Sequence, residues 1–147
     1  MKIFKSIFYL ALFLFCAQLA QAACLDPQTL VSGYKIPLKT EVDSSGIVVG
    51  KVIKKLDLHE DKSDPEDITA TLYTIRVQQT LKGTINKTIK IKSENDSGRY
   101  YMDIGEEHLL FLSGNDKYFY VNSCGNSSKL PEGNSTLKTV KEYLKKP

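Results

Sequence analysis

The sequence predicts a mainly β domain that follows a cleaved signal peptide and ends in a helix. Strand-like segments alternate with turn residues at short intervals along the mature chain. Gly50 interrupts the first of these segments, as expected where a small barrel turns a corner. Five strands, a bent first strand and a packing helix fit an OB-like Greek-key barrel. Because periodicity does not give the strand order, a β-sandwich remains open.

Residues 1–22 have the layout of a cleavable secretory signal. Two lysines precede the apolar run 7–17, and the small-residue triplet Ala-Gln-Ala follows it. The apolar run is too short to predict a stable membrane span. Cleavage after Ala23, an uncleaved anchor and lipid attachment at Cys24 remain open alternatives. Each of them gives the same compartment, so we expect a secreted or periplasmic protein.

Removing the signal leaves residues 23–147 as a single domain, with residues 133–147 as its C-terminal helix and tail. The whole chain carries 20 Lys and Arg against 17 Asp and Glu, and two of the lysines leave with the signal. The mature balance is therefore 18 against 17, which argues against nucleic acid as a partner. Packing in a hairpin explains the aromatic run 118–120 as well as a base-stacking platform does.

The cysteines of the mature chain form an even pair. Cys16 lies in the signal, so Cys24 and Cys124 remain in a compartment that permits disulfides. A bond between them is the expected outcome. A metal site would need further ligands, and nothing in the sequence places a histidine beside either cysteine.

The expected strands show alternating or continuous apolar patterns between turn residues. They span residues 47–53, 73–78, 89–92, 109–112 and 117–122. The fourth of these is apolar throughout, which predicts a strand covered on both faces. Ser135 is expected to cap a helix whose apolar stripe carries Leu137, Val140 and Leu144.

Two polar segments are expected to form loops. Residues 57–67 carry six acidic side chains and one proline, which predicts a solvated hairpin connection. Contact with a partner and calcium binding remain open for this loop, although its carboxylates lack the order of a dedicated calcium site. Residues 93–101 are polar and precede the fourth expected strand.

The sequence predicts no catalytic residues. The two histidines, His59 and His108, fall in the acidic loop and at a strand entry, and no spacing links either to a catalytic partner. No G-x-S-x-G elbow or similar nucleophile motif occurs. We therefore expect a protein that is not an enzyme and that needs neither a metal nor a cofactor.

Four short pieces, in order, resemble the netrin-like module, the fold of the N-terminal domain of tissue inhibitors of metalloproteinases. They are residues 48–52, residues 73–77 running on to 81–83, Gly105 with 109–111, and residues 122–124. They are similar to the family's "F-x-G-x-V", "F-x-V…L-K-G", "G-x-x-Y-L-V-F" and "S-C" signatures. The span from Cys24 to about Leu130 covers most of the mature chain.

The resemblance implies an OB barrel whose N-terminal segment is tied by the Cys24–Cys124 bond to the end of the fifth strand. It also implies a binding edge formed by the N-terminus, the loop after the first strand and the loop before the fourth. Transferred by position, the partner-binding residues are Ala23, Cys24, Leu25, Asp26, Ser97, Gly98, Arg99 and Tyr100.

The chain departs from the family at the device that clamps zinc. Inhibitory members begin with Cys-x-Cys and bond the first cysteine to a Cys-Gly in the loop before the fourth strand. Here one cysteine stands near the mature start, and Ser97-Gly98 occupies the loop position. The expectation is a monomer that binds a protein partner, with a metalloprotease as the class implied by the resemblance. The alternative is a structural or envelope-associated module.

Overall fold

The computed structural model describes residues 24–26, 28, 33–44, 46–64, 66–115 and 117–146. The expected signal peptide and Ala23 lie outside the described residues. The chain divides into two compact units, Met1–Tyr34 and Lys35–Pro147. All helices and strands named below belong to the second unit.

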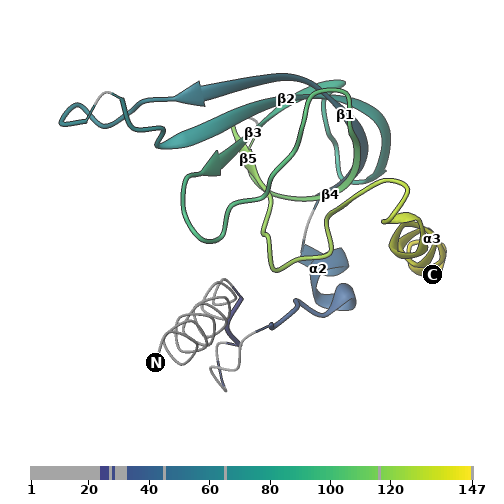
Figure 1. The fold of residues 1–147 in the computed structure, drawn as a ribbon. Coiled ribbons are helices and arrows are strands. Elements are labelled where there is room, and N and C mark those ends of the chain that lie inside the picture. The colour runs from purple at the N-terminus through teal and green to yellow at the C-terminus, as the bar shows by residue number, and fades with distance from the viewer. Residues whose placement is uncertain are drawn as a thin grey trace, which may run out of the picture. The chain divides into compact units, whose positions relative to one another are not determined.

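The second unit is a mainly β structure in which five strands close into a ring (Figure 1). The five strands of the ring are β1 (Gly46–Leu58), β2 (Ala70–Lys82), β3 (Thr88–Glu94), β4 (Glu107–Gly114) and β5 (Phe119–Tyr120). A sixth strand, β6 (Ser128–Lys129), pairs with β4 outside the ring. Their order in the described sheet is β1-β2-β3-β5-β4-β6, and an additional β1–β4 pairing closes the ring. The β3–β5 contact is parallel, and the other contacts are antiparallel.

Residues 47–50 of β1 and 108–112 of β4 are buried on both faces, which confirms the double cover expected for residues 109–112. Their even-numbered residues, such as Val48 and Leu110, pack in the barrel interior with Tyr73. Their odd-numbered residues, such as Ile47 and Phe111, pack in a second core outside the barrel. The period of two along each strand therefore divides one apolar run between two cores.

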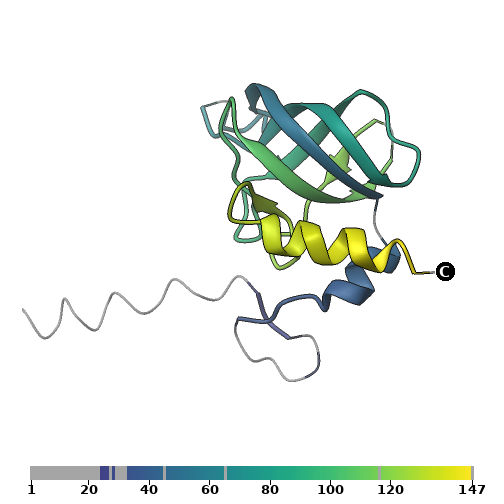
Figure 2. The same cartoon turned by 90° about the vertical axis from the view of Figure 1, so that its right-hand side faces the viewer.

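Two short helices cover the outer face of the barrel. They are α2 (Leu38–Ser44) and α3 (Asn134–Tyr143), and Val42 and Val140 are their buried contacts in the second core. Figure 2 shows α3 running along the barrel wall. The predicted Ser135 cap is wrong, because Gly133 occupies the N-cap without a side-chain hydrogen bond. Leu144 follows the end of α3 and is 36% exposed.

The bend expected at Gly50 is present. The register between β1 and β2 shifts at Val49/Gly50, and again between Val52 and Lys54. A Cβ built on Gly50 would lie 2.5 Å from Ile75 Cγ2 and 3.2 Å from the Arg76 carbonyl oxygen. Glycine is therefore required here by the close approach of β2, which lets the strand curve around the barrel.

Several predicted boundaries differ from the structure. Strand β1 extends five residues beyond Ile53, so that Asp57, expected in the acidic loop, pairs with Thr71 and accepts a hydrogen bond from its hydroxyl (2.9 Å). Ser93, expected in the next loop, belongs to β3 because its partner on β2 is also Thr71. Cross-strand pairing thus overrides local polarity. The fifth strand is shorter than expected, and β6 and α2 have no counterpart among the predicted elements.

The expected Cys24–Cys124 disulfide is present. Around Cys124, the chain is held by the second unit's own polar contacts: the Cys124 carbonyl accepts the Ile36 amide, and its amide donates to Asn122 Oδ1 (both 2.9 Å). Two residues after Cys124, Asn126 donates its backbone and side-chain N–H groups to the buried Glu41 carboxylate of α2 (2.6 and 2.7 Å). These bonds connect the segment after β5 to α2.

Candidate functional site

A cleft of about 270 Å³ lies where β3 and β5 separate. Within the described residues, these strands meet at one pair, Ile91 with Phe119. Beyond that pair, β3 continues to Glu94 while the chain leaves β5 at Val121. The lining residues are Lys92, Ser93, Glu94, Asp96, Gly98, Arg99, Tyr120, Val121 and Asn122.

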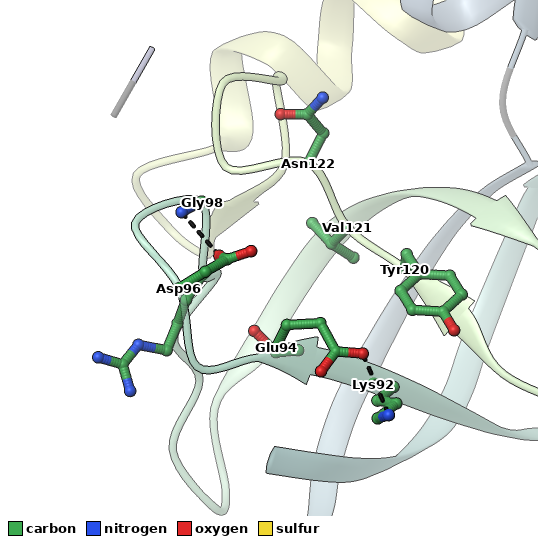
Figure 3. Close-up of a pocket in the computed structure, with 9 residues that line it drawn as sticks. Lys92, Glu94, Asp96, Gly98, Tyr120, Val121 and Asn122 are labelled. Carbon is green, nitrogen blue, oxygen red and sulfur yellow. Dashed lines mark hydrogen bonds and ion pairs between the residues drawn. The ribbon is translucent and has the colours of Figure 1, made fainter. Parts of the chain in front are cut away.

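The cleft has two walls and a base that come from different elements. In Figure 3, Asp96 and Gly98 form one side, and the chain from Tyr120 to Asn122 forms the other. Lys92 and Glu94 of β3 lie between them at the base. The site therefore combines a strand end, the loop that follows it and the exit from β5.

The wall formed by the loop after β3 is a hydrogen-bonded turn. Asp96 Oδ1 accepts the Gly98 amide (2.8 Å), and the Asp96 carbonyl accepts the Arg99 amide (3.3 Å). An aspartate that bonds the backbone two residues on is a common way to fix such a turn. Next to it, the Arg99 guanidinium lies 4.4 Å from the centre of the Tyr101 ring, and Tyr101 is 62% exposed.

Lys92 links the base of the cleft to the hairpin loop between β1 and β2. Its Nζ lies 2.8 Å from Glu60 Oε2 and 3.1 Å from Glu94 Oε1. These hydrogen bonds raise the pKa of Lys92 to about 12. The charge of Lys92 is thus compensated by two carboxylates, and the loop expected at residues 57–67 contributes Glu60 to the edge of this site.

The structure brings together part of the predicted site. Gly98 and Arg99 line the cleft, and Ser97 is exposed in the same turn. Tyr100 instead points its hydroxyl to His108 Nδ1 (3.1 Å) and is half-buried. Cys24, Leu25 and Asp26 belong to the first unit, where the Cys24 carbonyl accepts the Tyr34 amide (3.0 Å) and Asp26 Oδ1 accepts the Gln28 amide (2.7 Å).

The wall from Tyr120 to Asn122 was missed by sequence reasoning. Its only sequence signal is the step from the aromatic run into the Asn-Ser-Cys turn, which does not show that β3 and β5 separate there. Tyr120 is 42% exposed, whereas Phe119 is buried in the barrel core. The alternation places the Tyr120 ring at the cleft.

A chain of polar contacts runs beside the site and ties Tyr100 to the strands. His108 is 2% exposed, and its Nε2 lies 3.2 Å from Glu106 Oε2. Glu106 also accepts the Asp103 amide (2.9 Å) and pairs with Lys129 of β6. Sequence reasoning found no partner for His108, because the Tyr100 contact depends on how the loop folds back.

The charges and burial of Tyr100, His108 and Glu106 favour a structural role for these polar contacts. Burial lowers the pKa of His108, an effect that the nearby Glu106 opposes. Burial raises the pKa of Tyr100, so its phenol stays protonated at neutral pH. Tyr–His–Glu connectivity resembles that of a nucleophile, base and carboxylate, but burial disfavours the phenolate form of Tyr100 that would attack a substrate. The hydrogen bond to Lys129 holds the pKa of Glu106 at about 2.

The second histidine occupies a different setting. His59 lies in the exposed loop between β1 and β2, where its Nδ1 is 3.0 Å from the Asp67 carbonyl oxygen. In the same loop, Asp61 accepts the amide and hydroxyl of Ser63 (2.8 and 2.6 Å). Among the residues the structure describes, no three His, Cys, Asp or Glu side chains gather in a group suited to a metal ion.

Comparison of the chain with known protein families and with curated protein sequences found no match. Over the described residues, no helix combines the length and apolar character needed to cross a membrane.

Proposed function

We propose that this chain is an exported protein-binding module on an OB-like Greek-key barrel, and that its partner contacts residues 96–101 and the adjoining cleft. The ring order β1-β2-β3-β5-β4 supports the OB-like assignment. The disulfide supports export, because such bonds persist mainly outside the cytosol.

The contact between the half-buried Arg99 and the exposed Tyr101 is the observation that carries the binding proposal. Tyr and Arg dominate the binding energy of many protein interfaces. Here the two side chains stack, with 4.4 Å from the guanidinium to the ring centre, on a turn that Asp96 already fixes. A fixed turn loses little conformational entropy when a partner binds, and an exposed aromatic ring has apolar area to bury.

The resemblance to metalloproteinase inhibitors suggests a protease as the partner, but this sequence lacks the cysteines of the zinc clamp. That clamp needs the first cysteine of a Cys-x-Cys start, and Ser97-Gly98 replaces its loop partner. We therefore place binding energy on the loop and cleft and not on metal coordination. The alternative, a structural or envelope-associated module, needs no contact residues at all.

A paired variant tests the binding function. Arg99→Gln with Tyr101→Ser removes the contact between these two side chains, which belong to neither core, so we expect an unchanged melting temperature and loss of a partner captured from the native compartment. Arg76→Gln, an exposed arginine on β2, is the matched control and should keep that partner. An identical capture profile for all three proteins would favour the structural alternative.

Inhibition of a zinc protease is tested separately. We expect stoichiometric amounts of the mature protein to leave the turnover of a panel of zinc proteases unchanged, because the clamp is missing. Stoichiometric inhibition of any member, lost in the paired variant, would identify that protease as the partner.

A further inference from the structure

The cleft borders an edge of β3 that has no strand partner within the described residues, and Glu94 is the exposed residue of this edge. Lys92, Ser93 and Glu94 pair on one side with residues 70–72 of β2. On the other side, the pairing with β5 ends at Ile91. The three residues instead form the base of the cleft. Unpaired strand edges present backbone donors and acceptors in the spacing that another strand requires.

The size of the cleft is compatible with part of an extended chain. Pockets for drug-sized ligands typically measure about 300–1,000 Å³. The cleft measures about 270 Å³ and is lined by Val121 and Tyr120 on one wall. That space suits one or two side chains. Peptides that add to a sheet edge use this combination, since main-chain bonds give affinity and small pockets receive alternate side chains.

The charges around the cleft specify one feature of the occupant. Lys92 is compensated by Glu60 and Glu94, and Asp96 accepts the Gly98 amide. Among the described residues, no carboxylate lies within ion-pair distance of the Arg99 guanidinium, which stacks on Tyr101. A guanidinium held in this way is well suited to bind a carboxylate. The presence of Glu94 and Asp96 disfavours a polyanion in the same space.

We propose that the cleft binds an extended segment of the partner protein that carries one carboxylate side chain, adds as a strand to the Lys92–Glu94 edge and places that carboxylate on Arg99. This inference rests on the proposed function and specifies its partner. The occupant's backbone bonds to the β3 edge, one of its apolar side chains lies on Val121 and Tyr120, and its acidic side chain reaches the wall that carries Gly98 and Arg99.

The test uses the full mature chain and a random twelve-residue peptide library displayed on phage. We expect enriched peptides to carry an acidic residue at a fixed offset from an apolar one. A synthetic peptide of the enriched sequence should shift the backbone amide resonances of residues 92–94 and 120–122. Its affinity should fall about tenfold in Arg99→Gln, in line with loss of one charged hydrogen bond, and should be kept in Arg76→Gln.

A modified peptide and one further protein variant separate strand addition from simple surface adhesion. N-methylation of alternate peptide amides should abolish binding in one register and spare it in the other, because only every second amide of a strand faces its neighbour. Tyr120→Glu should weaken binding, since it adds a charge to the apolar wall. All variants should melt at the wild-type temperature.

The outcomes distinguish this inference from the binding function itself. No enriched peptide, equal binding to Arg99→Gln and Arg76→Gln, or equal effects of both N-methylated registers would overturn strand addition. If the native partner is still lost in the Arg99 and Tyr101 variant, the binding function survives that result. If no variant alters native capture but the peptide binds as expected, the cleft binds peptides and the proposed partner site is wrong.

Discussion

At Gly50, an added methyl group would lie 2.5 Å from Ile75 Cγ2 and 3.2 Å from a backbone oxygen. Backbone cannot move aside as a flexible side chain can, so Gly50→Ala should destabilise the fold by about 1–3 kcal/mol. Gly46→Ala is the matched control on the same strand, because its nearest neighbour is the end of the Ile85 side chain at 3.3 Å. Urea unfolding of both variants checks this, and equal losses would contradict the account.

His108 should make stability depend on pH. Burial lowers its pKa below the ordinary 6.5, so the unfolded chain binds a proton more readily than the folded chain. The free energy of unfolding should therefore fall as the pH decreases from about 6.5 towards the folded pKa. The groups that face His108 are Tyr100, Glu106 and Lys129, with Glu132 adding a weaker charge effect.

Urea unfolding at several pH values between 7 and 5 measures this dependence. His108→Gln should flatten it. Below that range, the free energy of unfolding should fall further as the pH decreases from the usual Glu pKa of 4.5 to the folded pKa of Glu106, about 2. A wild-type slope in His108→Gln above pH 5 would show that the ring titrates normally in the folded protein.

At the scale of elements, Val140 is the fully buried residue of α3, and Leu137 and Tyr143 pack partly buried against the same core. Val140 is fully buried against the outer faces of β1 and β4, while Leu144 lies past the helix end. Val140→Ala should cost roughly 2 kcal/mol through lost burial and a cavity, and Leu144→Ala less than about 0.5 kcal/mol. Thermal unfolding checks the pair, and a larger loss for Leu144 would contradict the packing of α3.

The sequence predicted the elements better than it predicted their ends. Period two revealed the central strands, and Gly50 revealed the bend, because both follow from local chemistry. Strand β1 continued through Asp57 because Thr71 pairs with it across the hairpin, which no local pattern contains. The loop carrying Gly98 and Arg99 was foreseen by position, whereas Tyr120 joins the site only because β3 and β5 separate.

At the scale of the whole molecule, the Cys24–Cys124 bond closes a loop of about 100 residues. Intact mass should rise by about two daltons on reduction, since two thiols replace one disulfide. In the loop-entropy model, replacing both cysteines by serine should lower stability by about 4–5 kcal/mol. The matched control is the native protein in reductant, which should melt at the same temperature as the double variant. An unchanged mass would exclude the bond.

The central claim is that a protein partner contacts the wall of the cleft formed by the loop after β3. Ser97 is exposed in that wall but does not line the cleft, so it can carry a photo-reactive amino acid without blocking the site. Lys90, which is exposed on β3 before the cleft, serves as the control position. We expect one partner protein to cross-link at position 97 and not at position 90. Equal cross-linking at both positions, or none at 97, would contradict it.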